Sequence, residues 1–440
     1  MDADVIVIGA GAAGLAAARD LALASLDVIL IEARDRIGGR VLPRPLASVL
    51  VPVELGAEFI HGRASETMAL LKQAGIATVP TGDEAWACED GGQLRREDRD
   101  YDLVQRALGA ASSLSKDVSA DEFLHGLARD PNMRDTAETA RSFVENFEAA
   151  DPAIASARAI ADEVGSGVDL MSTRPVGGYG PMFDLLRAEC IAAGARMMLS
   201  TAARALSWSS GSVTLDIVDP GKQARALRAR AAVVTLPVGV LHAQNGEASV
   251  AFSPELPSST RAALARLKMG HAWKVMIAFR TPFWQTIEGG RYQDSSFFRC
   301  DGGTFAAFWT QAPQVERTIC AWVGGPKAIA LQGAAPEELI ELAVDGVGAL
   351  LGQSARARGE FEAGAVHDWH ADPFSRGVYS YVAVGDDDPR AALAAPVDAT
   401  LFFAGEATST DGQGGTVNGA LVTGRRAAAE AAAVLGARAR

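Results

Sequence analysis

Residues 4–40, DVIVIGAGAAGLAAARDLALASLDVILIEARDRIGGR, decide the fold. An apolar run at residues 5–8 predicts a buried strand, residues 15–24 predict a helix, and residues 28–31 predict a second strand. Gly9, Gly11 and Gly14 form the pattern G-x-G-x-x-G at the turn between the first strand and the helix, and Glu32 closes the second strand. This order predicts a parallel βαβ unit of the doubly wound type.

Each residue of the pattern has a physical task in binding a dinucleotide. Gly9 permits the tight turn, Gly11 lets a pyrophosphate approach the backbone, and Gly14 lets the helix pack on the strand. The helix N-terminus would face the phosphates. Glu32 can accept hydrogen bonds from both ribose hydroxyls of an adenosine. We therefore expect a dinucleotide site; the alternative is a glycine-rich turn in an unrelated α/β fold.

The segment after Glu32 narrows the choice of cofactor. EARDRIGGR places a second tight turn at Gly38 and Gly39, and Arg40 can offer a charge-assisted hydrogen bond to a pyrophosphate. The extension resembles the FAD-dependent amine oxidase family, in which E-A-x-x-x-x-G-G-R follows the first βαβ unit. The resemblance implies FAD as the cofactor and adds Arg34, Gly39 and Arg40 to the residues that bind it.

Residues 53–62, VELGAEFIHG, resemble the family segment that passes beside the flavin ring. Gly56 and Ala57 are small enough to let the ring approach. His61 stands where many animal polyamine oxidases have a histidine near the substrate amine, so the resemblance makes it a candidate catalytic residue. A hydrogen-bonded histidine in the cleft, without chemistry, is the alternative.

Lys274 lies in the middle of an apolar run, GHAWKVMIAF at residues 270–279. If the run is a strand, both faces are apolar and should be buried, and burying an ammonium group is costly. The pattern G-x-x-x-K-V…F…F-W resembles the branch of polyamine oxidases and histone lysine demethylases, where a lysine on such a strand holds a water by the flavin N5. The resemblance implies a catalytic role for Lys274; the alternative is a lysine that snorkels to the sheet edge.

Residues 365–385, AVHDWHADPFSRGVYSYVAVG, add two aromatic candidates. Trp369 and Tyr379 have the spacing of a tryptophan and a cage tyrosine in the monoamine oxidases, and G-x-Y-S-Y is similar to polyamine oxidases. The resemblance implies that Tyr379 is one wall of an aromatic slot for the amine and that Trp369 packs near the flavin; the alternative is two ordinary core residues. Val378 replaces the cysteine that attaches FAD in monoamine oxidases, so non-covalent FAD is expected. Thr416 stands where those enzymes have a second cage tyrosine.

Residues 401–428 predict a buried strand at 401–403 followed by the closing helix. The resemblance places Glu406 where family members hydrogen-bond the ribityl chain or the pyrophosphate. It also places the N–H groups of Thr416 and Val417 near the flavin N1 and O2, where a helix N-terminus stabilises an anionic reduced flavin. Gly415 allows the close approach.

The rest of the chain predicts a second, interleaved domain. Helical patterns occupy residues 98–165, with a capping box at Ser119 and Glu122, and a hairpin is expected to turn at residues 209–211. We expect an α/β protein in which a Rossmann-like FAD-binding domain of the GR2 type interleaves with an α+β substrate domain of mixed sheet and helices. The expected FAD-binding segments are 1–75, 175–245 and 395–440, and the expected substrate-binding segments are 76–174 and 246–394.

Bulk composition excludes several classes of function. The 440 residues carry a net charge of −13, which repels nucleic acid. The four cysteines form no C-x-x-C pair and no cluster with zinc spacing, so we expect reduced thiols in a cytoplasmic protein without a metal site. The N-terminal stretch lacks the basic region of a signal peptide, and no stretch reaches about 18 uncharged apolar residues. We expect no membrane partner and a monomer or homodimer.

The resemblance implies an FAD-dependent amine oxidase. A primary or secondary amine would pass a hydride to the flavin N5, water would hydrolyse the imine to a carbonyl product, and O2 would reoxidise the flavin to give H2O2. The alternatives are a related FAD-dependent dehydrogenase or desaturase of the protoporphyrinogen or carotenoid type, and an inactive flavin-binding scaffold. Residues 75–170 should shape the substrate entrance, but they contain no motif from which the substrate amine can be identified.

Overall fold

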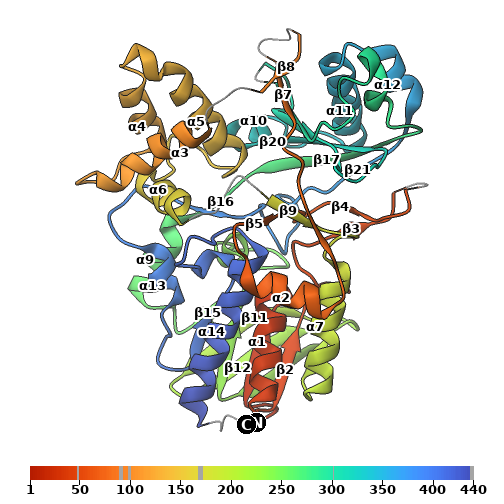
Figure 1. Ribbon diagram of the computed structural model, residues 1–440. Helices are drawn as coiled ribbons and strands as arrows, with labels where there is room; N and C mark the ends of the chain where they lie inside the picture. The colour runs from red at the N-terminus through yellow and green to blue at the C-terminus, as the bar shows by residue number, and fades with distance from the viewer. Residues whose placement is uncertain (47–48, 89–92, 98–100, 167–171, 301, 437–440) are drawn as a thin grey trace.

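The computed structural model describes residues 1–46, 49–88, 93–97, 101–166, 172–300 and 302–436. The lower half of the molecule in Figure 1 is built around a parallel sheet. Its strands are β1 (Val5–Ile8), β2 (Val28–Ile31), β10 (Arg196–Met198), β14 (Ala231–Val234) and β23 (Leu401–Phe403). Their order is β10-β2-β1-β14-β23, and every neighbouring pair is parallel. The predicted strands at 5–8, 28–31 and 401–403 are confirmed.

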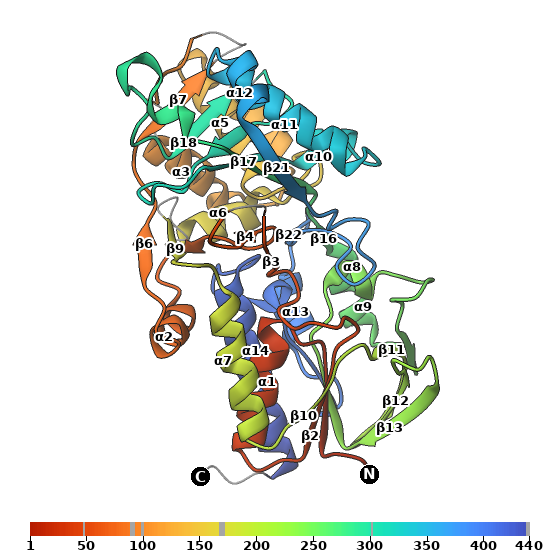
Figure 2. The same cartoon turned by 90° about the vertical axis from the view of Figure 1, so that its right-hand side faces the viewer.

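Helices cover one face of this sheet, and an antiparallel meander covers the other (Figure 2). The helices are α1 (Ala12–Leu23), α2 (Ser65–Gln73), α7 (Gly180–Ala192) and α14 (Val417–Leu435), and the meander is β11 (Ala202–Ser209), β12 (Ser212–Val218) and β13 (Ala224–Ala229). Val5 and Val7 pack in the helix-side core, whereas Ile6 and Ile8 pack on the meander side. Because both faces are covered, β1 is apolar throughout. The predicted hairpin is confirmed, since β11 and β12 pair up to the turn at residues 209–212.

The upper half contains a seven-stranded mixed sheet. Its strands are β7 (Ala85–Cys88), β8 (Arg95–Arg96), β17 (Ala272–Phe279), β18 (Phe297–Cys300), β19 (Ala307–Trp309), β20 (Thr318–Gly324) and β21 (Phe361–Val366). The outer core packs against α10 (Gly325–Ala330), α11 (Pro336–Leu350) and α12 (Ser354–Glu360). All eight residues of β17 are buried, as predicted. Ile277 faces this outer core, whereas Met276 faces Leu55 and Trp369 on the side of the lower half.

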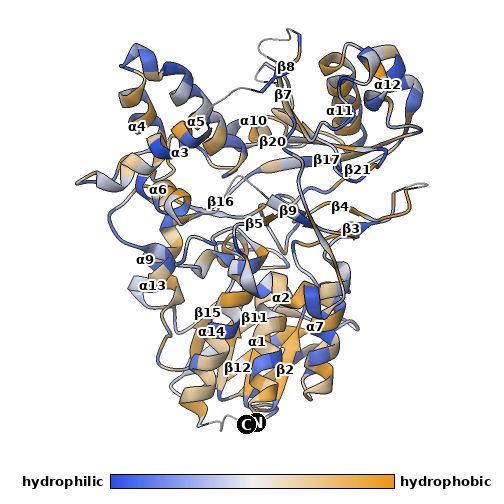
Figure 3. Cartoon of the chain, viewed as in Figure 1, coloured by the Kyte–Doolittle hydropathy of each residue, from blue (hydrophilic) through white to orange (hydrophobic). Residues whose placement is uncertain are grey.

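Four helices form a separate cluster beside the seven-stranded sheet (Figure 1): α3 (Tyr101–Gly109), α4 (Ala120–Leu127), α5 (Arg134–Asn146) and α6 (Ala157–Gly165). Ser119 caps α4 by accepting a hydrogen bond from the N–H of Glu122 at 3.1 Å, which confirms the predicted N-cap. Figure 3 shows hydrophilic stretches on α4 and mostly hydrophobic colouring along β2, in keeping with a surface helix and a covered strand.

The remaining shorter elements lie within the two halves and in the segments between them. The strands are β3 (Pro43–Arg44), β4 (Val53–Glu54), β5 (Ile60–His61), β6 (Thr78–Pro80), β9 (Ser172–Pro175), β15 (Ala251–Ser253), β16 (Leu267–Met269) and β22 (Ser380–Val382). The α-helices are α8 (Val238–Leu241), α9 (Ser258–Arg266) and α13 (Pro389–Ala394). The 3₁₀ helices are η1 (Ala110–Ser113), η2 (Pro131–Met133), η3 (Phe283–Gln285), η4 (Ile287–Gly289) and η5 (Glu406–Thr408).

The chain passes repeatedly between the two halves, which fits the expected interleaving. The boundaries between the two domains stay a proposal, and the packing of three leucines favours different boundaries from those expected. These leucines are Leu256, Leu264 and Leu393, which lie in segments that we expected in the substrate domain. They pack in the core between the parallel sheet and the meander. Among the described residues, no helix is both long and apolar enough to cross a bilayer.

Candidate active site

A cavity of about 470 Å³ lies where the two halves meet. Ile8 and Ile31, at the carboxyl ends of β1 and β2, line it, and open α/β sheets bind ligands at this edge. The predicted site residues that line it are Gly9, Gly11, Glu32, Arg34, Gly39, Arg40, Gly56, Ala57, His61, Lys274, Trp369, Tyr379, Glu406, Gly415, Thr416 and Val417. Gly14 lies behind the lining, where a Cβ would come within 1.7 Å of the carbonyl oxygen of Gly9. Only glycine therefore lets α1 pack against the turn.

The turn between β1 and α1 can accommodate a pyrophosphate. Gly9 has φ +107°, which favours glycine. A Cβ on Gly11 would meet the Cα of Gly39 at 3.9 Å and no nearer described atom, so the turn is open where it lines the cavity. Glu32 is buried beside it and accepts hydrogen bonds from the N–H groups of Ala10 (2.8 Å) and Arg34 (2.9 Å). An open glycine turn at a helix N-terminus, with a buried acid beside it, suits the dinucleotide half of FAD.

Two arginines shape the neighbouring loops. Arg36, which sequence reasoning missed, donates hydrogen bonds to the carbonyl oxygens of Ile37, Gly39 and Val41 and thereby holds the second glycine turn. Arg34 donates to Asp372 at 2.6 Å. Burial opposes ionisation of Asp372, but hydrogen bonds from His367 and Arg34 outweigh it and lower the pKa of Asp372. Arg34 thus fastens a distant loop over the cavity, in addition to the cofactor contact predicted for it.

Glu406 is the centre of a buried polar network. Its Oε1 accepts a hydrogen bond from Arg40 at 2.9 Å, and its Oε2 accepts from the hydroxyl of Ser380 at 2.7 Å and the N–H of Gly415 at 3.1 Å. Burial opposes ionisation, but the charges of Arg40 and Arg390 outweigh it and lower the pKa of Glu406. The carboxylate therefore joins the loops around the cavity. Its predicted contact with the ribityl chain or pyrophosphate stays a prediction.

The N-terminus of α14 lies against Tyr379. Thr416 caps the helix by accepting a hydrogen bond from the N–H of Gly419 at 2.9 Å. Gly415 has φ +71°, and a Cβ there would lie 3.4 Å from the Tyr379 ring. The structure thus brings together Gly415, Thr416, Val417 and Tyr379, as the sequence led us to expect.

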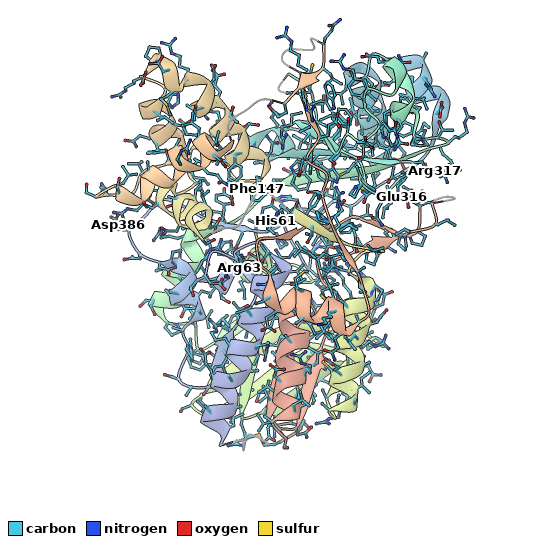
Figure 4. All side chains as sticks on the ribbon, viewed as in Figure 1. His61, Arg63, Phe147, Glu316, Arg317 and Asp386 are labelled. Carbon is cyan, nitrogen blue, oxygen red and sulfur yellow. The ribbon has the colours of Figure 1, made fainter. Side chains whose placement is uncertain are left out.

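The three predicted aromatic and imidazole candidates also lie at the cavity. Tyr379 donates its hydroxyl hydrogen bond to the carbonyl of Phe147 at 2.5 Å, and burial raises the pKa of Tyr379. Trp369 donates to the carbonyl of Leu55 at 2.9 Å. The rings of His61 and Phe147 are 5.2 Å apart at the junction of the two halves (Figure 4). All three side chains line the cavity, and the roles predicted for them stay predictions.

Lys274 is buried, with 4% of its surface exposed, and does not snorkel to the sheet edge. Its Nζ lies 2.6 Å from Oε2 of Glu58 and donates to the carbonyl of Gly56 at 3.1 Å. Oε1 of Glu58 lies 2.9 Å from Nε of Arg174. Burial opposes ionisation of Glu58, but the charges of Lys274 and Arg174 outweigh it and lower the pKa of Glu58 to about 2.

Sequence reasoning missed both Glu58 and Arg174. Glu58 follows Gly56 by two residues, but no pattern marks its carboxylate as a partner for a lysine in a distant strand. Arg174 is in β9, which reaches this place because it pairs with β5 just beyond Glu58. The signal that was available is physical: a buried ammonium group requires a nearby anion or strong acceptors.

Two acidic residues, Glu148 and Glu163, line the cavity wall, and sequence reasoning missed them as well. Glu163 pairs with Arg390 at 3.0 Å, and Glu148 is buried beside Glu163. Burial, followed by the neighbouring charge of Glu163, raises the pKa of Glu148 well above its ordinary value. The raised pKa favours a neutral Glu148 carboxyl beside the Glu163 carboxylate, whose charge Arg390 balances, so this wall offers polar groups with little net charge.

A family model described as "Flavin containing amine oxidoreductase" matches residues 12–110 and 106–432. The chain belongs to this family of flavin-containing amine oxidoreductases. It is therefore an oxidoreductase that acts on amines and uses FAD, which confirms the predicted enzyme class and cofactor. The cavity fits this cofactor. The glycine turn and the buried Glu32 suit its dinucleotide half, and Lys274 and the N-terminus of α14 line the rest of the cavity.

Curated relatives extend along nearly the whole chain. A protein named polyamine oxidase 3, from Oryza sativa subsp. japonica, is 29% identical over 97% of this chain and 88% of its own length. A protein named lysine-specific histone demethylase 1 homolog 2, from Arabidopsis thaliana, is 28% identical over 98% of this chain and 58% of its own length. The chain thus spans somewhat more than half of that relative.

Solved structures confirm the fold class. Putrescine oxidase bound to putrescine superposes with a TM-score of 0.80 at 22% identity, covering 98% of this chain and 99% of that one. Cyclohexylamine oxidase from Brevibacterium oxydans has a TM-score of 0.80 at 21% identity and covers 99% of both chains. The α/β architecture of interleaved parallel and mixed sheets is therefore that of the FAD-dependent amine oxidases.

Proposed function

We propose that this protein oxidises a C–N bond of a primary or secondary amine to an imine, which water hydrolyses to a carbonyl product, with O2 as the electron acceptor and H2O2 as the second product. The observation that carries the proposal is a single cavity lined at one end by the dinucleotide turn and at the other by Lys274, Tyr379 and Trp369. When bound, FAD supplies the acceptor for the two electrons and the α-hydrogen that the amine loses.

The residues of this chain have separate tasks in that reaction. Glu32 and the turn at Gly11 bind the adenosine and pyrophosphate, and α14 presents its N-terminus from Thr416. Val378 stands where a covalent link would require a cysteine, which supports non-covalent FAD. Tyr379 cannot swing freely because its hydroxyl is bonded to Phe147, so it forms a fixed wall for the amine.

Lys274 is suited to hold a water molecule. An ammonium group has three N–H donors. Glu58 and the carbonyl of Gly56 take two of them, which leaves one for the cavity that Lys274 lines. A water bound there would be available for hydrolysis of the imine.

Glu148 and Glu163 support an amine as the substrate, because a neutral carboxyl and a carboxylate at the cavity wall can both form hydrogen bonds with an amine. The names of the relatives point the same way, since polyamine, putrescine and cyclohexylamine oxidases all act on amines. The demethylase homologue is a longer protein, and we propose no activity on histones from it.

A peroxide assay with a panel of amines tests the function. The panel contains spermine, spermidine, putrescine, tyramine and cyclohexylamine. The purified protein should carry oxidised flavin that acid precipitation releases into the supernatant, and at least one amine should yield peroxide. Lys274→Met should retain the flavin and lose most of the turnover. Flavin that stays with the precipitate would refute non-covalent binding, and bleaching by an amine without peroxide would refute O2 as the acceptor.

We also propose a cytoplasmic location, because none of the four cysteines is joined in a disulfide. Fractionation of cells that express the protein would test this proposal.

A further inference from the structure

Three charged side chains from separate segments form one buried array beside the cavity. Arg174 comes from β9, Glu58 from the loop between β4 and β5, and Lys274 from β17. Glu58 lies between the two cations, 2.9 Å from Nε of Arg174 and 2.6 Å from Nζ of Lys274. All three side chains are at most 8% exposed. The array therefore carries one net positive charge in a region from which water is largely excluded.

The surroundings hold Glu58 ionised and in place. Nε1 of Trp309 and Nε2 of Gln311 both donate to its carboxylate at 3.2 Å. The guanidinium of Arg174 stacks over the ring of Phe59, 4.6 Å from its centroid, and also donates to the carbonyl of Ala312 at 3.3 Å. Such a scaffold is more than a lysine needs for burial, because one carboxylate would already balance one ammonium group.

We propose that Glu58 is a positioning and charge-setting residue: it orients Lys274 toward the cavity and cancels one of the two buried positive charges that would otherwise act on the bound FAD. The proposal rests on the proposed function only in that the flavin ring lies at the Lys274 end of the cavity. Glu58 and Lys274 line the cavity, whereas Arg174 is set behind Glu58. Removing the carboxylate leaves two cations, and removing Arg174 leaves a neutral pair.

These changes have opposite signs at the flavin. A reduced flavin carries more negative charge than an oxidised one, so an added positive charge nearby favours reduction and a lost one disfavours it. Glu58→Gln should raise the midpoint potential of the bound FAD, and Arg174→Met should lower it. For one unit charge in a partly shielded site, the equilibrium with a reference dye should shift by roughly tenfold, which is about 30 mV for a two-electron couple.

The experiment measures that potential by slow reduction of the holoenzyme with a redox dye present, without any amine. Glu58→Asp keeps the charge and should leave the potential unchanged. The double variant Glu58→Gln/Arg174→Met restores one net positive charge and should return the potential close to that of the wild type. Opposite shifts that cancel in the double variant support the proposal.

Equal potentials in the wild type and Glu58→Gln, or shifts of the same sign in both single variants, would overturn it. If Glu58→Gln does not fold because Arg174 is left unpaired, Arg174→Met is compared with the double variant instead. The midpoint potential of the double variant should then be higher than that of Arg174→Met by the same tenfold shift in the dye equilibrium. No step requires amine turnover. An enzyme that oxidises no amine but shows the shifts would refute the proposed function and leave this inference intact.

Discussion

The buried carboxylate of Glu406 holds together the loops around the cavity. It is 4% exposed and has Arg40, Arg390 and Ser380 as neighbours. Glu406→Gln leaves Arg40 without its carboxylate, whereas Arg390 keeps Glu163. We expect a loss of roughly 3 kcal/mol in the free energy of unfolding. Urea titration at pH 7 measures it, and Glu247→Gln, at an exposed site, is the control. A loss below 1 kcal/mol would contradict the account.

The same residue has a defined pH dependence. The pKa of Glu406 is lowered in the folded protein, so its stabilising effect is complete above the unfolded value of about 4.5 and is lost as the pH falls through the folded value. The difference in stability between the wild type and Glu406→Gln should therefore shrink only in the acidic range below pH 4.5.

His271 predicts acid sensitivity at a higher pH. Its ring stacks on His370 at 4.1 Å, and burial, followed by the neighbouring His370, lowers the pKa of His271 to about 4. Between pH 6.5 and 4 the unfolded chain binds a proton at this residue that the folded chain does not bind, so stability falls as the pH falls. His271→Phe should flatten that part of the stability profile in urea titrations. A variant whose profile runs parallel to that of the wild type would show that the acid sensitivity lies elsewhere.

At the scale of elements, the N-terminus of α14 depends on one hydroxyl. Thr416→Ala removes the cap that accepts from the N–H of Gly419, which should cost about 1 kcal/mol of unfolding free energy. Thr416→Ser keeps the oxygen and should stay near the wild type. Chemical denaturation of both variants makes the comparison. Equal losses in the two would assign the effect to the lost methyl group and contradict a capping role.

The elements themselves were largely predictable, because their causes are local. The strand at residues 5–8, the turn at Gly9 and Gly11 and the hairpin at residues 209–212 follow from apolar runs and glycines a few positions apart. The contacts of Lys274 with Glu58 and Arg174 were not predictable in this way. They depend on three segments that meet only after the mixed sheet and the small sheet of β5, β9 and β6 have formed. The positions of site residues could thus be foreseen better than their partners.

At the scale of the whole molecule, the cofactor should stabilise the fold. The cavity is lined by both halves, from Gly9 and Glu32 below to Lys274 and Trp309 above, so a ligand that fills it contacts both. Protein stripped of FAD should unfold at lower temperature, and FAD at a hundred times its Kd should add about 2.7 kcal/mol. Thermal unfolding at increasing FAD concentrations measures the effect. ADP, which can contact only the lower half, should bind more weakly and therefore stabilise less than FAD at equal ligand concentration. Equal stabilisation at equal concentration would contradict a bridging role.

The central place of β1 in the parallel sheet has a consequence for biosynthesis. β1 is made first, yet its neighbour β14 comes from residues 231–234, and the sheet is completed by β23 at residues 401–403 and covered by α14 at residues 417–435. A ribosome must therefore synthesise the segment from β1 to α14 before the nucleotide pocket closes. During synthesis β1 therefore lacks its neighbour β14 until residues 231–234 have been made, and the complete lining of the pocket exists only once α14 has been made.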